Sequence, residues 1–270
     1  MSETLVSRRS HLQIDWYGAG PTLLLLHGWG MNGAVWRDLA PALADMGFRV
    51  GTVDLPGFGD SPGQDLPQGG EALASLAEVV WSAFPDNEPV HLLGWSLGGL
   101  VATRMVLQAP SRTRSLVTLA SSPCFQGSAT WPGIAPAVLG QFRQQLAQDC
   151  DKTLSAFFAL QAMGSATARE DVRRLKRAVM SKPKPDPEAL DRGLGILQEC
   201  DLRPQLAKLS GPWLRLYGRL DGLVPARVIE QVDSLAPGSV SVQIEKASHA
   251  PFISHPEETL AVLQRFYQGL

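Results

Sequence analysis

The chain has 270 residues, 44% hydrophobic content and a formal net charge of −2 at pH 7. This length and apolar content are enough for one large domain with a buried core, and they exclude a disordered or fibrous chain. The near-neutral charge provides no general attraction to nucleic acid or anionic membranes. The three cysteines, Cys124, Cys150 and Cys200, form no CxxC pair, so the sequence indicates neither a zinc site nor a disulfide framework.

The N-terminal region indicates no export or membrane anchoring. Arg8 and Arg9 are not followed by an apolar stretch, and the longest strongly apolar run, residues 23–26, is far too short to span a bilayer. An odd number of unpaired thiols favours a reducing compartment. We therefore expect a cytoplasmic monomer with no membrane or nucleic-acid partner, no metal and no organic cofactor.

Short apolar runs rich in Val and Leu alternate with helical patterns along most of the chain. Such runs predict buried strands at residues 22–26, 48–53, 90–93, 115–119, 213–217 and 240–244. Helical periodicity predicts helices at residues 34–46, 71–84, 97–108, 226–235 and 257–267. Apolar strands that alternate with helices indicate an α/β fold: a doubly wound, mostly parallel sheet covered on both faces.

The alternation stops between Cys124 and Gln205, where the pattern becomes helical and is interrupted by prolines. A helical block inserted between two strands of a parallel sheet lies over the carboxyl ends of the strands. We therefore predict a core made of residues 1–123 and 206–270, and a helical lid, residues 124–205.

Two pentapeptides fit the GxSxG pattern that carries the nucleophile of many hydrolases, GWSLG around Ser96 and GDSPG around Ser61. A nucleophile elbow needs a strand before the serine, a sharp turn and a helix after it, and only Ser96 has all three. The residue after the nucleophile donates its backbone N–H to the oxyanion, and Pro62 has no N–H to donate. We predict Ser96 as the nucleophile and a loop around Ser61.

A serine nucleophile needs a histidine base, which in this arrangement follows the serine in the chain. His249 and His255 are the histidines downstream of Ser96. His249 follows a predicted strand, where its side chain would project above the sheet, whereas His255 precedes a helix and is typical of a capping or surface residue. We prefer His249 and keep His255 as the alternative.

The base in turn needs a carboxylate that orients it. Asp221 follows a predicted strand through a short turn and so lies at the carboxyl end of that strand. Asp201 ends a helical stretch, and Asp233 lies inside a helix, on its expected solvated face. We prefer Asp221, although an aspartate before a glycine also serves simply to form a turn.

The second oxyanion donor is expected in the loop after the first predicted strand, LHGWG. The small residues there let the backbone approach the reacting carbonyl. We predict that the backbone N–H groups of Trp29 and Leu97 form the oxyanion hole. A glycine turn with Trp29 as a core side chain is the structural alternative.

The chain resembles the α/β-hydrolase superfamily over nearly its whole length. The residues that carry the resemblance are LLLLHGWG, DLPGFGDS, HLLGWSLGGL, LYGRLDGLVP and ASHAPFISHP. Within the superfamily, ASSPCF, WPGI and FFALQAMG resemble the pimeloyl-acyl carrier protein methyl ester esterases of biotin synthesis. The resemblance implies a Ser96, Asp221 and His249 triad, oxyanion and substrate contacts from Trp29 and Leu97, and an acyl site lined by Phe157, Phe158, Ala159, Leu160 and Gln161.

An acyl carrier protein is the partner that this resemblance implies, and such carriers are acidic. Residues 169–184 contain seven basic and two acidic residues. Arg169, Arg173 and Arg177 recur every four residues, which on a helix forms one stripe, here called the basic stripe. Lys152 and Arg143 would extend it. The stripe is expected to attract an acidic carrier, unless it is only a solvated helix face.

The candidate triad predicts a serine hydrolase, and the resemblance implies a carboxylesterase that hydrolyses the methyl ester of a carrier-linked pimeloyl chain. Phe157, Phe158 and Leu160 would give its acyl site the apolar surface that such a chain needs. The alternatives are a general short-chain carboxylesterase, a carbon–carbon bond hydrolase or a non-enzymatic ligand receptor of the same fold. Dehalogenase and epoxide-hydrolase activities are disfavoured because relatives with these activities have Asp, not Ser, at the elbow.

Overall fold

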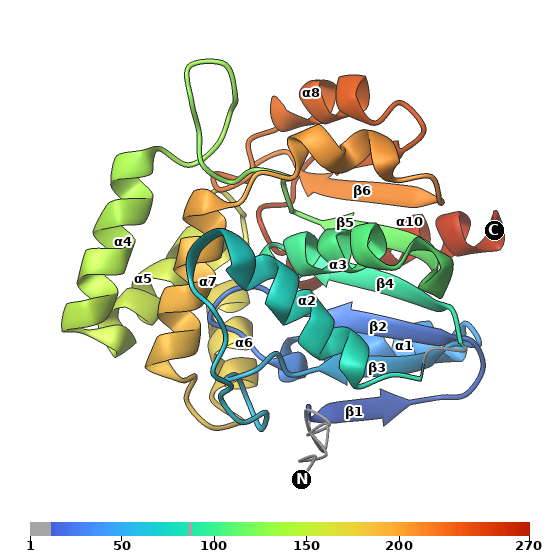
Figure 1. Cartoon of the computed structure of the whole chain (residues 1–270), viewed down its shortest axis with the longest axis horizontal. Helices are drawn as coiled ribbons and strands as arrows, with labels where there is room; N and C mark the ends of the chain where they lie inside the picture. Colours follow the sequence, from blue (N-terminus) through green and yellow to red (C-terminus); the bar gives the residue numbers. More distant parts are fainter. Residues whose placement is uncertain (1–11, 86–87) are drawn as a thin grey trace, which may run out of the picture.

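A seven-stranded sheet forms the centre of the computed structural model, which describes residues 12–85 and 88–270. The strand order is β1-β3-β2-β4-β5-β6-β7, and all neighbours are parallel except β1, which pairs antiparallel with β3. The strands are β1 (Ile14–Tyr17), β2 (Thr22–Leu26), β3 (Arg49–Val53), β4 (Val90–Trp95), β5 (Thr113–Leu119), β6 (Trp213–Gly218) and β7 (Val240–Ile244). The predicted doubly wound, mostly parallel sheet is confirmed (Figure 1).

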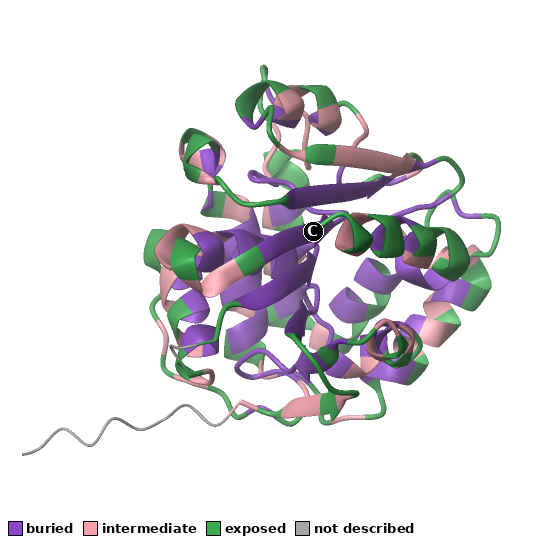
Figure 2. Cartoon of the chain, turned by 90° about the vertical axis from the view of Figure 1, so that its right-hand side faces the viewer, coloured by how far each residue is buried: buried purple, intermediate pink, exposed green. Residues whose placement is uncertain are grey.

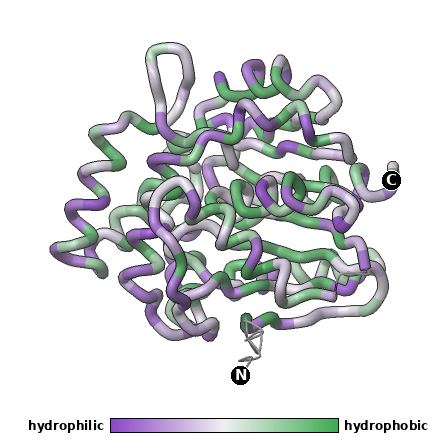
Figure 3. Tube along the Cα trace, in the orientation of Figure 1, coloured by the Kyte–Doolittle hydropathy of each residue, from purple (hydrophilic) through white to green (hydrophobic). Residues whose placement is uncertain are grey.

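The core strands form where the sequence is apolar on both faces. Every residue of β2, β4 and β6 is buried, which requires helices above and below the sheet. Figure 2 shows these central strands as the buried interior, whereas the helices expose their outer faces. Figure 3 shows hydrophobic residues concentrated in the same strands. The edge strand β1 is only half-buried and has no continuous apolar run. For this reason the search for apolar runs did not predict it.

The core helices cover both faces of the sheet. Helices α2 and α3 pack on one face, and α1 and α10 on the other (Figure 1). The core helices are α1 (Leu39–Asp45), α2 (Ala72–Ser82), α3 (Leu97–Gln108), α8 (Val228–Leu235), α9 (Pro251–Ser254) and α10 (Pro256–Gln268).

The helix predicted at residues 34–46 is wrong in its extent. The structure has a 3-10 turn, η1 (Gly33–Trp36), followed by α1. The cause is Pro41, which has no backbone N–H and would break a helix that began at residue 34. In the observed α1 it lies in the first turn, where its missing N–H has no partner to lose.

The predicted lid region contains four helices between β5 and β6, and they lie beyond the carboxyl ends of the parallel strands (Figure 1). Its first residues, 124–135, form a loop instead of a helix. Cys124 pairs with Asp201 in an isolated antiparallel bridge, so the two connections to the core run side by side. The helices are α4 (Pro136–Gln148), α5 (Cys150–Gln161), α6 (Ala168–Val179) and α7 (Pro187–Glu199).

The division into a core, residues 1–123 and 206–270, and a lid, residues 124–205, stays a prediction, and residues 1–11 of that core lie outside the described chain. Within the described residues, no helix combines the length and the apolar character needed to cross a membrane.

Candidate active site

Ser96 lies in the sharp turn that joins β4 to α3. Its backbone has φ 54° and ψ −119°, a conformation that is strained for a residue with a side chain. The flanking glycines are required by space: a Cβ on Gly98 would lie 2.2 Å from the Leu26 carbonyl oxygen, and one on Gly94 would lie 2.2 Å from the Gly98 carbonyl oxygen. The turn is held because Ser121 Oγ donates to the Ser96 carbonyl at 2.8 Å.

Ser96, His249 and Asp221 form one hydrogen-bonded chain. His249 Nε2 lies 2.9 Å from Ser96 Oγ, and His249 Nδ1 lies 2.8 Å from Asp221 Oδ2. A carboxylate only accepts, so Nδ1–H donates to Asp221 and Nε2 is free to accept the serine proton. The other oxygen of Asp221 accepts the backbone N–H groups of Leu223 and Val224 at 2.8 and 3.0 Å, which fixes the carboxylate in place.

The alternative acids and base lie in other environments. His255 is the residue before α10, and its Nδ1 bonds Ser254 Oγ. Asp201 forms an ion pair with Arg203 at 2.6 Å. Asp233 does not simply face solvent as expected, because it pairs with the buried Arg215.

Ser61 has a structural role. Its Oγ donates to the Asp54 carbonyl oxygen at 2.6 Å and accepts the Gln13 N–H at 2.9 Å. The GDSPG segment is part of a loop, without a helix after the serine. Its hydroxyl therefore holds that loop against the N-terminal part of the core.

The loop after β2, residues 27–33, is here called the oxyanion loop, and it packs directly beside Ser96. A Cβ on Gly28 would lie 3.3 Å from Ser96 Cβ, a tight contact, so glycine favours this close approach of the loop. Within the described residues, the backbone N–H groups of Trp29 and Leu97 have no hydrogen-bond acceptor in turns or loops. Leu97 is the first residue of α3, so its N–H has no acceptor inside that helix either. Both are therefore available to a ligand, as the predicted oxyanion hole requires.

His27 is bonded to backbone on both sides of its ring. Its Nδ1–H donates to the Gly28 carbonyl oxygen at 2.8 Å, and its Nε2 accepts the Leu55 N–H at 3.1 Å. The ring is fully buried, and burial lowers the pKa of His27 to about 4. The imidazole is therefore neutral at neutral pH, in the tautomer that donates to Gly28.

A narrow apolar cavity of about 10 Å³, close to the size of one water molecule, opens onto Ser96. Ser96 is the one polar residue in its lining, so the cavity suits an uncharged, largely hydrocarbon ligand. Its apolar lining consists of Phe125, Ile134, Leu139, Phe142, Phe157, Leu194, Leu197 and Leu223. Most of these residues were not predicted, although Leu139 with Phe142, and Leu194 with Leu197, are pairs three residues apart that mark one helix face.

Of the five consecutive residues predicted for the acyl site, one lines the cavity beside Ser96. Phe157 lines the cavity and packs edge-on against Trp29, with ring centroids 4.7 Å apart. The Gln161 carbonyl oxygen accepts the backbone N–H of His249 at 3.1 Å. Phe158 is buried and Leu160 is half-buried, whereas Ala159 is exposed.

The basic stripe lies on the exposed face of α6, where Arg169, Arg173 and Arg177 all face solvent. Arg173 forms an ion pair with Glu170. Lys152 is exposed on α5.

Arg143 does not extend the stripe with a free charge. It forms two hydrogen bonds with Asp191, at 2.6 and 2.8 Å, and lies 3.8 Å from Glu199. The hydrogen bonds from Arg143 outweigh partial burial and lower the pKa of Asp191. The cationic surface is therefore smaller than the sequence predicted.

The fold is shared with other solved structures. An esterase from Exiguobacterium antarcticum superposes with a TM-score of 0.85 at 21% identity, covering 95% of each chain. A bromoperoxidase from Bacillus anthracis superposes with a TM-score of 0.84 at 22% identity, also covering 95% of each chain. At these identities the likeness establishes the fold.

Sequence comparison identifies much nearer relatives. The family described as alpha/beta hydrolase fold matches residues 21–256. The pimeloyl-acyl carrier protein methyl ester esterase of Aeromonas hydrophila is 53% identical, over 94% of this chain and 98% of that protein. The protein of the same name from Photobacterium profundum is 52% identical, over 92% of this chain and 95% of that protein. The chain therefore belongs to the α/β-hydrolase family and, within it, to the family of the pimeloyl-acyl carrier protein methyl ester esterases.

Proposed function

We propose that the protein is a serine carboxylesterase that hydrolyses the methyl ester of a pimeloyl chain carried by an acyl carrier protein. The reaction type is inferred from the hydrogen-bonded chain that runs from Asp221 through His249 to Ser96. Ser96 faces an apolar cavity. The names of relatives about 50% identical supply the substrate.

The first half of the reaction forms an acyl-enzyme. His249 Nε2 takes the proton of Ser96 as Oγ attacks the ester carbonyl, and the Asp221 carboxylate stabilises the resulting imidazolium. The negative oxygen of the tetrahedral intermediate accepts the Trp29 and Leu97 backbone N–H groups. His249 then protonates the departing methoxide, which leaves as methanol.

The second half of the reaction regenerates the free enzyme. His249 removes a proton from a water molecule as its oxygen attacks the acyl carbonyl, and then gives that proton to Ser96 Oγ as the ester bond to the serine breaks. No metal or organic cofactor takes part. The product is a carboxylic acid that ionises at neutral pH, and an ionised carboxylate is disfavoured in a cavity lined by hydrocarbon. The lining therefore favours the ester over its product.

The partner in this proposal is the carrier protein, which the basic stripe and Lys152 attract through its acidic surface. We propose that the enzyme works as a monomer in the cytoplasm, where its three free cysteines would stay reduced.

A comparison of two substrates tests the proposal. The purified protein is given the methyl pimeloyl carrier protein and, separately, free short-chain p-nitrophenyl esters. We expect a kcat/KM for the carrier-linked ester at least about tenfold higher than for the free esters, a difference of about 1.4 kcal/mol in transition-state stabilisation. Ser96→Ala should abolish turnover of both, whereas Ser61→Ala, at the other GxSxG match, should retain it.

Three outcomes would argue against the proposal in different ways. A preference for the free esters would favour a general short-chain carboxylesterase. Cleavage of carbon–carbon bonds without ester cleavage would favour the carbon–carbon hydrolase. Failure of a fluorophosphonate probe to label Ser96 would favour a ligand receptor.

A further inference from the structure

The lid region holds the oxyanion loop by direct hydrogen bonds. Trp29 Nε1 donates to the Leu190 carbonyl oxygen of α7 at 2.8 Å. Asn32 Nδ2 donates to the Val179 carbonyl oxygen of α6 at 3.0 Å. Because both acceptors are backbone groups of lid helices, a shift of these helices displaces the loop that carries the Trp29 N–H.

A buried carboxylate holds the same loop from the core side. Asp54, which follows β3, is fully buried, and its Oδ1 accepts the Gly33 N–H at 2.6 Å. Its Oδ2 accepts the Asp60 N–H at 2.9 Å. A Cβ on Gly59 would lie 2.3 Å from Asp54 Oδ2, so the surrounding loop closes tightly around the carboxylate.

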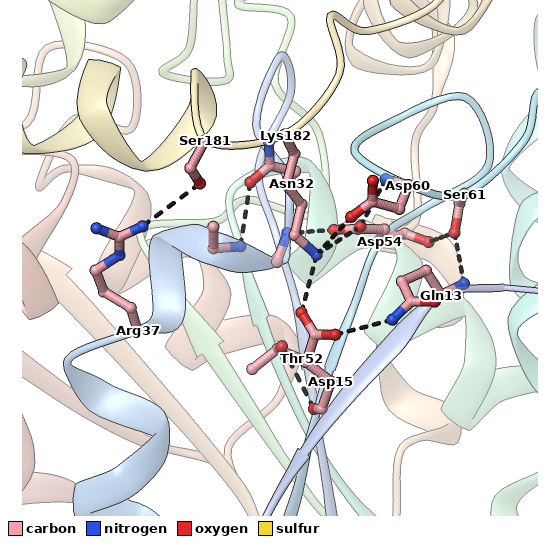
Figure 4. Close-up of polar contacts among 12 residues, drawn as sticks. Gln13, Asp15, Asn32, Arg37, Thr52, Asp54, Asp60, Ser61, Ser181 and Lys182 are labelled. Carbon is pink, nitrogen blue, oxygen red and sulfur yellow. Dashed lines mark hydrogen bonds and ion pairs between the residues drawn. The ribbon is translucent and has the colours of Figure 1, made fainter.

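Lys182, in the connection between α6 and α7, neutralises this carboxylate. Its Nζ lies 2.9 Å from Asp54 Oδ2, 2.9 Å from Asp15 Oδ2 and 3.4 Å from Asp60 Oδ2 (Figure 4). Among the described residues, Lys182 is the one cation within 4 Å of Asp54. Burial favours loss of the proton, but hydrogen bonds to Asp15 and Asp54 outweigh it and raise the pKa of Lys182. Lys182 therefore stays charged at neutral pH.

We propose that Lys182 is a positioning residue for ester hydrolysis, because its ion pair with Asp54 joins the lid region to the oxyanion loop and keeps the Trp29 N–H directed at the reacting oxygen. This inference rests on the proposed function, since it assigns a role within the same reaction.

The physical reason is the buried position of Asp54. Without Lys182 the buried Asp54 carboxylate has no cation beside it and lies near two further carboxylates, Asp15 and Asp60, so it turns away from them. This change weakens its bond to Gly33 and loosens the oxyanion loop. An oxyanion donor is effective only within a few tenths of an ångström of its position, so a small displacement lowers turnover more than substrate binding.

Lys182→Met, with Lys184→Met as its matched control, tests the proposal. Lys184 lies in the same connection, but its side chain is 80% exposed and it pairs with the exposed Asp151. Turnover of a small soluble ester is measured per active site, counted by the fluorophosphonate that Ser96 takes up at completion. We expect Lys182→Met to lower kcat by about tenfold or more while KM changes less than about twofold. Lys184→Met should match the unchanged protein.

A transition-state analogue separates positioning from stability. A trifluoromethyl ketone forms a tetrahedral adduct on Ser96 with its oxygen in the oxyanion hole, so its affinity should fall by the same factor as kcat in Lys182→Met. A purely structural Lys182 would lower the amount of active protein and leave both quantities per active site unchanged. That result would overturn the proposal.

The double variant Lys182→Met/Asp54→Asn covers the case in which Lys182→Met does not fold. It removes both charges, and the amide oxygen of the asparagine can still accept the Gly33 N–H, although the bond from the Asp60 N–H is lost. We expect the double variant to fold and its kcat to remain low, because the ion pair that joins the lid region to the oxyanion loop is absent. Normal turnover in the double variant would refute the positioning role. Failure of the unchanged protein to hydrolyse any ester would instead refute the proposed function.

Discussion

At the scale of single residues, His27 sets the direction of the proposed oxyanion donor. The Gly28 carbonyl and the Trp29 N–H belong to one planar peptide group and point in opposite directions. The carbonyl accepts from His27 Nδ1–H at 2.8 Å and from the Met31 N–H at 3.2 Å. These two bonds hold the carbonyl and therefore hold the N–H at the other end of the same peptide.

His27→Leu should lower kcat of the esterase, because the Gly28–Trp29 peptide loses a bond that fixes its plane. The loss should approach but not exceed the roughly 10²- to 10³-fold cost of removing a whole oxyanion donor. His27→Asn, whose amide can still donate to the Gly28 carbonyl oxygen, should retain more activity. Steady-state kinetics on a soluble ester would measure both. Equal losses in the two variants would rule out the hydrogen bond as the cause.

The sequence predicted the residues whose positions follow from strand ends. Ser96, Asp221 and His249 each follow a parallel strand, and the carboxyl ends of such strands meet at one edge of the sheet. The bond between Lys182 and Asp54 joins residues 128 positions apart, and neither residue belongs to a periodic pattern. Only the packing of the lid region on the core creates that contact, so the sequence alone could not reveal it.

At the scale of elements, α6 shows what helical spacing can and cannot predict. Leu175, Ala178 and Val179 form its buried face, and the basic stripe lies opposite, as the four-residue spacing requires. The spacing could not show that Arg174 turns to the core, where it donates to the Ile253 carbonyl oxygen. Arg174 therefore adds no free charge to the outer face of the helix, where Arg169 and Arg177 of the stripe are exposed.

Reversing two charges of the stripe tests its role in carrier binding. Arg169→Glu/Arg173→Glu should lower kcat/KM for the carrier-linked ester by several-fold, mainly through slower association, and leave a small soluble ester unaffected. The effect should shrink as salt is raised from low to physiological ionic strength, because salt screens exposed charges. Kinetics on both substrates at two salt concentrations would measure it.

A matched control has the same change in net charge at another place. Arg227 at the start of α8 and Arg265 on α10 are exposed and lie on core helices. Arg227→Glu/Arg265→Glu should leave carrier-dependent turnover unchanged. If the control variant slowed turnover as much as the stripe variant, net charge and not the stripe would be responsible.

The composition of the cavity beside Ser96 could not be predicted from the periodicity of single helices. Its lining comes from the loop before α4, from α4, α5 and α7, and from the loop after β6. An apolar helix face shows that a helix packs against something, but it does not show against what. The faces of α4 and α7 were therefore recognisable in the sequence, whereas their meeting above Ser96 was not.

At the scale of the whole molecule, two buried histidines link stability to pH. Burial lowers the pKa of His27 to about 4, and burial together with the charge of Arg114 lowers the pKa of His91 to about 4. Both residues start from an ordinary value of 6.5, so the unfolded chain binds protons between pH 6.5 and 4 that the folded protein does not. Their contribution to stability is complete above pH 6.5 and is lost as the pH falls toward 4.

His91→Asn should make the protein less sensitive to acid. His91 lies in β4, where its Nδ1 bonds Ser115 Oγ at 2.8 Å and its ring packs against Phe48 and Tyr267. An asparagine side chain can keep the bond to Ser115 but does not titrate. Urea unfolding at several pH values should therefore show an unfolding free energy that depends less steeply on pH in the variant than in the unchanged protein. An unchanged slope in His91→Asn would show that another group controls acid unfolding.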